Sequence, residues 1–254
     1  MAKLGKQDIH VAAHRAAHNH APENSIAAVD AAIELGVSVV ELDVRATKDG
    51  VLVLMHDQKL DRTTNGKGKI SEYTYAEIQQ LYLRETANGK ISQQRIPTFQ
   101  EALKRCKGKV IIDIDYKEDR DGFMEKTYAL IHQEGMEDEV LFFLYEYQKM
   151  ADLHALNPRI TLFPRARSMD DLREIVSLAM TKVVHLDDSF TDLKVLNSWK
   201  EQGYFFWINS LGEADDKAAK KGISIYTDFL KRFPFVRIVQ TDAPELWGDL
   251  LKGL

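Results

Sequence analysis

Two carboxylates, Glu41 and Asp43, stand out because they interrupt the end of an otherwise apolar run at residues 37–44. Residues i and i+2 of a β-strand point to the same face, so the two side chains converge. Two like charges beside a core are costly unless a cation or a proton lies between them. The pair therefore predicts a site for a divalent metal bound through oxygen ligands. The alternative is an edge strand with both acids in water.

The next apolar run brings a histidine toward this pair. Only six residues separate the two runs, too few for a crossover helix, and their last two, Asp49-Gly50, are a strong hairpin signal. A turn centred on Asp49-Gly50 pairs Asp43 with His56, and a turn centred one residue earlier pairs Glu41 with His56. Either register predicts an imidazole beside a carboxylate.

Two more acids and a lysine alternate along a second apolar run. Asp113, Asp115 and Lys117 face one way within residues 110–117, and that face is a barrel interior if the residues between them meet the helices. Acids and an amine inside a barrel are hard to explain structurally unless they form an ion-paired layer. We expect Asp115 and Lys117 to complete a metal site and bind an anion, and Asp113, one layer deeper, to be structural.

His14-Arg15 ends the first apolar run, and α/β folds bind their ligands at such strand ends. A lone histidine in this position is more often structural than catalytic. The loop that follows holds His18 and His20, which we expect to be solvated. Residues 24–25 offer an N-cap for the next helix.

Strand-like and helical segments alternate along the chain and would position these side chains. The expected strands are residues 9–13, 37–44, 51–55, 110–115, 140–144, 160–163, 183–186, 204–208 and 236–240. The expected helices are residues 25–35, 98–107, 123–133, 147–156, 169–179, 193–202 and 214–221. This alternation predicts parallel strands covered by helices, as a doubly wound sheet or a closed barrel. The hairpin accounts for the ninth strand signal.

The segment between the hairpin and the helix at residues 98–107 differs from the rest. Residues 61–95 are rich in Asn, Gly, Lys, Tyr and Gln, and loops of this length are usually functional. We expect a single domain, residues 1–254, with an inserted cap at about residues 58–96 over one barrel mouth.

Composition excludes several classes of protein. The 254 residues are 44% hydrophobic and 29% charged, which is ordinary for a globular chain, and the net charge of −5 provides no basic field for nucleic acid or an anionic membrane. No apolar run approaches the roughly 20 residues of a membrane span, so we expect no stable membrane insertion. Residues 1–9 lack a signal-peptide core, and the only cysteine, Cys106, fits a reducing compartment. We expect a soluble protein that is cytoplasmic or, if a signal peptide has been removed, periplasmic or secreted.

The motifs follow one another in an order that resembles one family over nearly the whole chain. The chain is similar to the glycerophosphodiester phosphodiesterases, and several spaced motifs in a fixed order are far more specific than any one of them. The motifs that carry the resemblance are His14-Arg15, Pro22-Glu23-Asn24, Glu41-x-Asp43, Thr47-Lys48-Asp49-Gly50, His56-Asp57, Leu60-Asp61-Arg62-Thr63-Thr64, Asp115-x-Lys117, Trp207-Ile208-Asn209 and Thr241-Asp242-Ala243-Pro244.

The resemblance implies a distorted (β/α)8 TIM barrel with a small inserted cap. It also implies one divalent cation, Mg²⁺ or Ca²⁺, and hydrolysis of a small-molecule glycerophosphodiester to glycerol 3-phosphate and an alcohol. By motif position, the metal ligands would be Glu41, Asp43 and Asp115, the acid–base pair His14 and His56, and the substrate-binding residues Arg15, Lys117 and Trp207.

Phosphodiester cleavage needs one group to take a proton from the nucleophile and another to give one to the leaving alkoxide. His56, next to an acid on the hairpin, is better kept protonated than His14. We therefore expect His56 to be the general acid and His14 the general base. In one route the glycerol 2-hydroxyl attacks first, and water then opens the cyclic phosphate.

Some positions depart from the pattern of the family and touch the expected pocket wall. Ala16 stands where the family has Gly, Asp115 is one methylene shorter than the family's Glu, and residues 143–145 read Phe-Leu-Tyr where many members carry Ser-Ser-Phe. Arg165 is a candidate for a further anion contact. Two alternatives stay open: a lysophospholipase D-type phosphodiesterase, and a non-catalytic phosphate-ligand-binding protein on the same fold.

Overall fold

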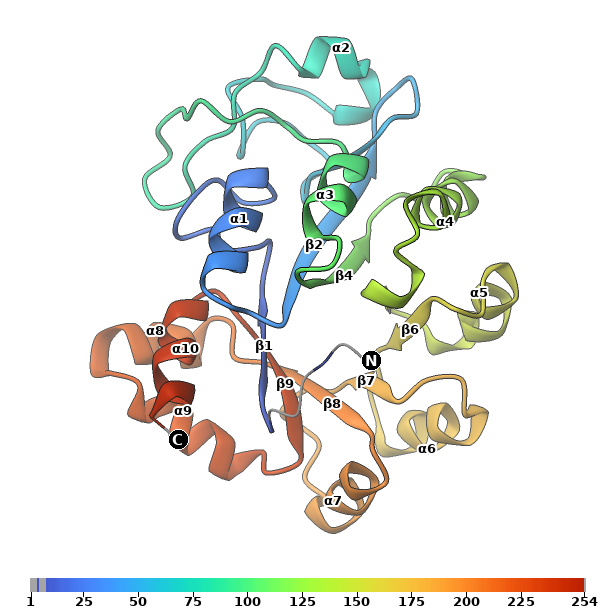
Figure 1. Ribbon diagram of the computed structural model, residues 1–254, viewed down its shortest axis with the longest axis vertical. Coiled ribbons are helices and arrows are strands. Elements are labelled where there is room, and N and C mark those ends of the chain that lie inside the picture. Colours follow the sequence, from blue (N-terminus) through green and yellow to red (C-terminus); the bar gives the residue numbers. More distant parts are fainter. Residues whose placement is uncertain (1–3, 5–7, 254) are drawn as a thin grey trace.

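Eight parallel strands surround a central axis and helices cover their outer side (Figure 1). The computed structural model describes Leu4 and residues 8–253. Neighbouring strands follow the order β6-β5-β4-β2-β1-β9-β8-β7, and a bridge between Arg165 and His185 brings β7 beside β6. The ninth strand, β3, pairs with β2, is antiparallel to it and lies outside the circle of eight. The predicted eight-stranded barrel is therefore confirmed.

The strands have the following bounds: β1 His10–Ala13, β2 Val39–Ala46, β3 Leu52–Leu54, β4 Ile111–Tyr116, β5 Val140–Leu144, β6 Thr161–Pro164, β7 Val183–His185, β8 Phe205–Asn209 and β9 Val236–Thr241. The α-helices are α1 Ile26–Glu34, α2 Tyr75–Ile78, α3 Phe99–Cys106, α4 Phe123–Glu134, α5 Met150–Leu156, α6 Met169–Leu178, α7 Leu193–Glu201, α8 Glu213–Lys221, α9 Ser224–Arg232 and α10 Pro244–Lys252. Short 3-10 helices occupy Ile70–Glu72, Glu137–Glu139 and Tyr147–Lys149.

Alternation along the strands separates two apolar layers. Side chains such as Val40, Ile112 and Ile114 pack outward against the helices. The inward residues one position away form a second buried cluster near the amino ends of the strands. That inner cluster consists of Leu4, Ala12, Val39, Ile111, Leu141, Phe163, Val183, Trp207 and Ile238.

The inward face changes from apolar to acidic toward the carboxyl ends of the strands. Two residues after Val39 comes Glu41, and the parallel register of β2 and β4 places it opposite Asp113. One layer higher, Asp43 is opposite Asp115. The expectation that Asp113 and Asp115 face the interior is thus confirmed, and Glu41 and Asp43, predicted to share one face, lie on the same interior face because inward residues recur every second position.

The hairpin between β2 and β3 has a register that differs from both predicted ones. Its loop contains three residues, 48–50: the Thr47 amide donates to the Val51 carbonyl at 3.0 Å, and Gly50 has a left-handed φ of 80°. The extra loop residue shifts the ladder by one position relative to either two-residue turn. Asp43 consequently lies opposite Met55, whose amide donates to the Asp43 carbonyl at 3.0 Å. The prediction that His56 faces Glu41 or Asp43 across the hairpin was wrong.

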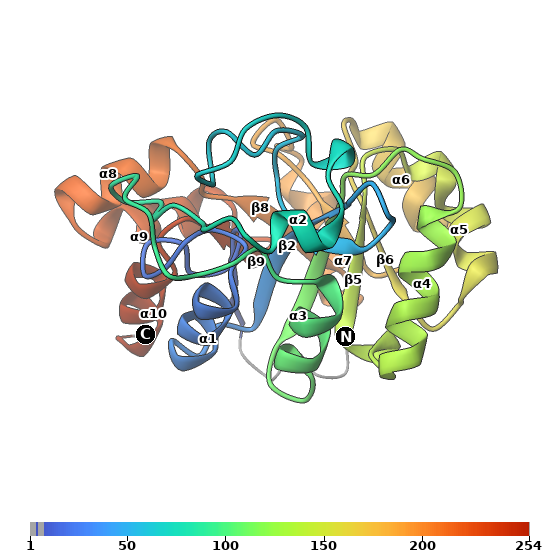
Figure 2. The same ribbon diagram turned by 90° about the horizontal axis from the view of Figure 1, so that it is seen from above.

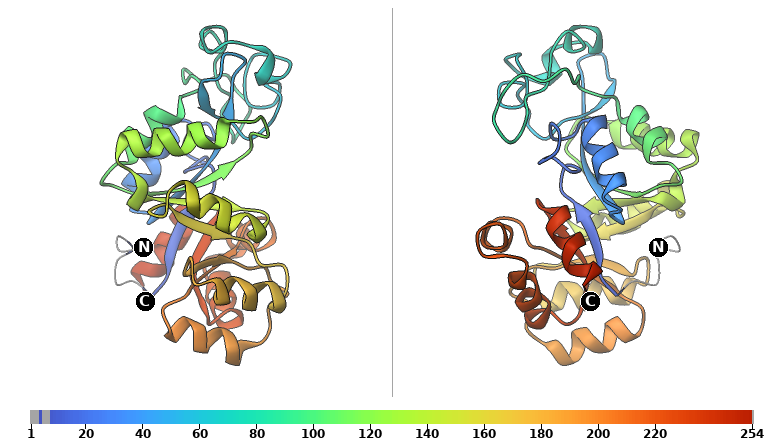
Figure 3. Two further views of the ribbon diagram at one scale, coloured as in Figure 1. Left: turned by 90° about the vertical axis from the view of Figure 1, so that its right-hand side faces the viewer. Right: turned by 60° about the vertical axis from the view of Figure 1, so that its left-hand side comes forward.

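The long segment between β3 and α3 projects from one side of the barrel (Figure 3). It carries the short helix α2 and has a small apolar cluster of its own, which includes Leu60, Ile70, Ile78 and Leu83. Val53 and Met55 join this cluster, so the base of the segment is anchored on β3.

The connection between β8 and β9 is also unusual, because it contains two helices, α8 and α9, that pack against each other (Figure 2). The helical pattern at residues 214–221 matches α8, whereas α9 was not predicted. Among the described residues, no helix has the length and apolar character to span a bilayer. Most of residues 1–9, on which the signal-peptide expectation rests, lie outside the described part of the chain.

Candidate active site

Three carboxylates meet at the carboxyl end of the barrel. Glu41, Asp43 and Asp115 each offer one oxygen, and these oxygens all lie within 4.8 Å of one another. Glu41 and Asp43 are almost fully buried. Burial, followed by the charges of Asp43 and Asp115, raises the pKa of Glu41 well above its ordinary value. The cluster therefore concentrates more negative charge than its surroundings solvate, which favours a cation among these oxygens.

Lys117 supplies part of the compensating charge. Its Nζ lies 2.5 Å from Asp115 Oδ2, 3.4 Å from Asp43 Oδ1 and 3.0 Å from the Tyr145 hydroxyl. Burial disfavours the ammonium, but Asp115 and Asp43 outweigh it and raise the pKa of Lys117 above its ordinary value. The Tyr145 hydroxyl also donates to Asp115 Oδ2 at 2.9 Å, so the aromatic residue that departs from the family's pattern here holds the shorter acid.

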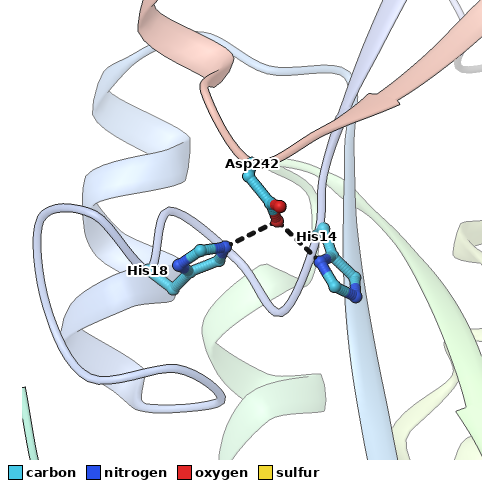
Figure 4. Close-up of side chains that lie close together, drawn as sticks. All are labelled: His14, His18 and Asp242. Carbon is cyan, nitrogen blue, oxygen red and sulfur yellow. Dashed lines mark hydrogen bonds and ion pairs between the residues drawn. The ribbon is translucent and has the colours of Figure 1, made fainter. Parts of the chain in front are cut away.

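His14 is oriented by an aspartate from the far end of the chain (Figure 4). Its Nδ1 lies 2.7 Å from Asp242 Oδ1, and its Nε2 lies 3.9 Å from Glu41 Oε2. His18 Nε2 lies 2.7 Å from the same Asp242 oxygen. Burial opposes ionisation of Asp242, but the hydrogen bonds with His14 and His18 lower its pKa well below the ordinary range. An ionised oxygen only accepts, so both imidazoles donate to it and His14 Nε2 is turned toward the acid cluster.

His18 is not the solvated loop residue that we expected. Only 13% of its side chain is exposed, because the bond to Asp242 draws it under the loop. His20 is 43% exposed and lies 3.5 Å from Glu245, in closer agreement with the expectation.

The loop after β1 reaches both acids of β2. Arg15 and Ala16 have left-handed φ angles of 49° and 62°, which turn the Arg15 amide onto Glu41 Oε2 at 2.7 Å. Asn24, also left-handed, donates from Nδ2 to Asp43 Oδ2 at 2.8 Å and accepts from the Asp43 amide. Ser25 is thus the N-cap of α1, and the loop keeps its turn with alanine where the family has glycine.

Ion pairs connect His56 to the same loop. His56 Nδ1 lies 2.7 Å from Asp57 Oδ1, and Asp57 pairs with Arg62. Arg62 pairs in turn with Glu23 at 2.6 Å, and Glu23 pairs with Arg15 at 3.0 Å. Hydrogen bonds from Arg62 outweigh burial and lower the pKa of Asp57 well below its ordinary value. His56 is therefore tied to the loop after β1 through Asp57 and Arg62.

A cavity of about 150 Å³ lies over His14, Glu41 and Asp115, and its lining does not include Asp43, Arg15, His56 or Lys117. Asp113 Oδ1, below the carboxylates Glu41, Asp43 and Asp115, is buried without a hydrogen-bond partner among the described residues. Burial, then the charges of Asp115 and Asp43, raises the pKa of Asp113. The cavity is lined by His14, Glu41, Asp113, Asp115, Phe143, Tyr145, Phe163, Arg165, His185, Asn209, Leu211 and Gln240.

Comparison with known proteins bears on this arrangement. Residues 14–229 match the model of the glycerophosphoryl diester phosphodiesterase family. The chain belongs to this family.

Curated relatives of this family member differ in how much of their length it spans. A glycerophosphodiester phosphodiesterase of Caldanaerobacter subterraneus is 35% identical over 156 residues, which cover 60% of this chain and 64% of that protein. The match thus spans slightly less than two thirds of that relative. An uncharacterized protein of Bacillus subtilis is 30% identical over 95% of this chain and 98% of its own length.

Solved structures share the fold of this phosphodiesterase-family chain. A glycerophosphoryl diester phosphodiesterase of Parabacteroides distasonis superposes with a TM-score of 0.85 at 24% identity, covering 99% of this chain and 89% of that one. An Oleispira antarctica phosphodiesterase, solved with its product sn-glycerol-3-phosphate, has a TM-score of 0.76 at 24% identity and covers 96% of this chain and 97% of that one.

Trp207 lies beneath the cavity rather than in its wall. The indole is fully buried, and its Nε1 donates to Asn209 Oδ1 at 3.0 Å and to Gln240 Oε1 at 3.3 Å. Asn209 and Gln240 both belong to the lining of the cavity. Phe163, whose ring lies 4.6 Å from that of Trp207, also lines the cavity, so Trp207 acts on a ligand through the side chains that separate it from the cavity.

Asp242 is the main site residue that sequence reasoning missed, although it belongs to a motif quoted above. It follows β9, at the same end of the barrel as the acids. That position was a usable signal, because the carboxyl ends of all barrel strands meet at one mouth. Its contact with two histidines could not be foreseen from spacing.

Proposed function

We propose that this protein hydrolyses glycerophosphodiesters to glycerol 3-phosphate and an alcohol. The observation that carries the proposal is the arrangement at the mouth: Glu41, Asp43 and Asp115 within 4.8 Å of one another, beside a histidine whose Nδ1 is occupied by an aspartate. Carboxylates clustered next to an oriented imidazole suit phosphoryl transfer, which needs charge neutralisation and proton transfer. Membership of the family supports this choice of chemistry.

The three carboxylates would hold one divalent cation, Mg²⁺ or Ca²⁺. Both ions prefer oxygen ligands, and the raised pKa values of Glu41 and Asp113 indicate charge that a cation would relieve. When bound, the cation would neutralise charge that develops on the phosphoryl oxygens. Lys117 and Arg15 would add positive charge toward the phosphate. Both side chains already lie beside Asp43, with Lys117 Nζ at 3.4 Å and Arg15 Nε at 3.6 Å.

His14 suits the role of general base. Its Nδ1–H is directed to Asp242, which leaves Nε2 with a lone pair on the side of Glu41 and the cavity. In the proposed route, Nε2 takes the proton of the glycerol 2-hydroxyl or of a water molecule. Asp242, which stays ionised, stabilises the imidazolium that results.

His56 would then protonate the leaving alkoxide. Asp57 lies 2.7 Å from its Nδ1 and orients the ring. About 35% of the His56 side chain is exposed, so a proton can be replaced from solvent. Each such transfer is typically worth about 10²- to 10⁴-fold in rate.

A single assay tests the proposal. Purified protein is incubated with glycerophosphocholine, with and without EDTA, and released glycerol 3-phosphate is measured. We expect release that EDTA abolishes and that added Mg²⁺ or Ca²⁺ restores. Full activity in chelator would remove the metal from the mechanism, and faster cleavage of lysophosphatidylcholine would favour the lysophospholipase D-type alternative. Calorimetric binding without turnover would favour the non-catalytic alternative.

A further inference from the structure

A second cavity, of about 600 Å³, lies next to the cavity over the acid cluster. Four residues line both spaces, namely Arg165, His185, Asn209 and Leu211. We call the larger space the β8 groove; it is further lined by Asp187, Asp188, Ala214, Lys217, Phe229 and Arg232. A ligand in the smaller cavity could therefore extend past Arg165 into the groove.

The extra helix between β8 and β9 makes this groove. Ala214 and Lys217 come from α8, whereas Phe229 and Arg232 come from α9. The opposite wall follows the carboxyl ends of β7 and β8, so the groove opens at the same barrel mouth as the acid cluster. Figure 1 shows the pair α8 and α9 beside α10.

The walls of the groove carry charged groups of both signs. Arg165 lies 3.6 Å from Asp187, and Arg232 lies 3.2 Å from Asp188. Apolar residues also line the groove, namely Leu186, Ile208, Leu211, Ala214, Ile225, Phe229 and Phe233, and carbon atoms of a ligand can pack on them. A purely alkyl ligand would still cover the charged groups without replacing the hydrogen bonds that water makes to them. A hydroxyl both donates and accepts, so several hydroxyls could bond to the carboxylates and the guanidinium groups together. The carboxylates are Asp187, Asp188, Glu213 and Asp228, and the cations are Arg165, Lys217 and Arg232.

The two volumes suit the two halves of a diester. The 150 Å³ cavity corresponds to about five waters at roughly 30 Å³ each, so it holds a phosphoryl group and only part of a small polyol such as glycerol. The remaining alcohol must leave this space, and the neighbouring groove is four times larger by volume, 600 against 150 Å³.

We propose that the β8 groove binds the leaving alcohol and selects diesters whose alcohol is a bulky neutral polyol. This inference rests on the proposed hydrolysis of glycerophosphodiesters and adds the class of alcohol. Arg165, at the junction of the two cavities, contacts the ligand where the phosphate meets the polyol. The surplus of one carboxylate in the lining disfavours an additional anionic group on the alcohol.

Binding can be tested separately from turnover in a His14→Ala protein. Its affinity for glycerophosphoinositol and for glycerophosphoethanolamine is measured by calorimetry with Ca²⁺ present. We expect the inositol diester to bind about tenfold more tightly or better, because its ring fills the groove. Adding Ala214→Trp, at a position that lines the groove but not the smaller cavity, should remove that advantage and leave the affinity for the ethanolamine diester within about twofold. Ala219→Trp, at an exposed position of the same helix, is the matched control and should change neither affinity.

Equal affinities of the two diesters, or an equal loss of both in Ala214→Trp, would overturn the assignment of the groove. Absence of turnover by the wild-type protein on both diesters, with the difference in binding preserved, would instead reject the proposed hydrolysis and leave the polyol groove in place. The two failures are therefore distinguishable.

Discussion

The acids and the histidines of the site are held in different ways. Asp43 and Asp115 lie on adjacent parallel strands, so backbone register sets their spacing. His14 and His56 lie just beyond strand ends, and aspartates hold them through side-chain contacts at 2.7 Å. Changes in the strand-borne acids should therefore alter ligand binding first, whereas changes around the histidines should alter turnover first.

The largest effect is expected from removal of the histidines. His14→Ala and His56→Ala should each lower kcat by about 10²- to 10⁴-fold, because each removes one proton transfer. Thermal unfolding should show that both variants stay folded. His132→Ala is the matched control, since that histidine is 74% exposed and pairs with Glu137 on the outside of the barrel. Near-normal turnover in either site variant would remove it from the acid–base pair.

A smaller effect is expected when the support of His14 is weakened. Asp242→Asn keeps an acceptor near Nδ1 but loses the charge that favours the imidazolium, so kcat should fall about 10- to 100-fold with KM little changed. The control is Asp249→Asn, whose exposed side chain pairs only loosely with Lys252 at 3.5 Å. A change in KM with kcat preserved would mean that Asp242 acts on binding and not on the base.

The stability of the folded protein should depend on pH through His185, which ends β7 and lines the cavity. Burial, followed by the charge of Arg165, lowers the pKa of His185 from 6.5 to about 4. Between these values the unfolded chain binds a proton that the folded chain does not, so stability falls as the pH decreases. This group should contribute about 2 kcal/mol of that loss between pH 7 and pH 5. Urea unfolding at the two pH values should show a smaller loss in His185→Gln, and an equal loss would contradict the buried neutral imidazole.

The smallest effect concerns the left-handed alanines. Ala179 has a φ of 54° at the exposed end of α6, so Ala179→Gly should stabilise the protein by up to about 1 kcal/mol. Replacement of Ala16, whose φ is 62°, by glycine should also relieve backbone strain. It removes a buried methyl group, however, and burial of that group contributes about 0.8 kcal/mol to stability. Chemical denaturation should therefore give Ala16→Gly the smaller gain. A larger gain at Ala16 would show that the loop after β1 is under more strain than its geometry indicates.

The sequence predicted the placement of the acids on the strands better than the contacts of the histidines. Alternation by two placed Glu41, Asp43, Asp113 and Asp115 on the interior face, because that periodicity is a local property of strands. The partner of His56 across the hairpin was predicted wrongly, since one additional loop residue moves the whole ladder.

Contacts between distant parts of the chain were beyond local patterns. His14 and Asp242 are 228 residues apart in sequence, and only closure of the barrel brings them together. The β8 groove depends on α9, whose pattern was not recognised, and on packing between α8 and α9. Neither the spacing nor the composition of those helices predicts a cavity.

The most direct measurement is an anomalous difference map from crystals grown with Mn²⁺, a substitute for Mg²⁺ or Ca²⁺ at oxygen sites. The part of the chain that the structure describes offers two candidate groups, the carboxylates Glu41, Asp43 and Asp115 and the cluster His14, His18 and Asp242. We predict one peak among the three carboxylates, at about 2.0 to 2.6 Å from their oxygens. A map with no peak there, or with the ion bound between the two histidines and Asp242, would contradict the account.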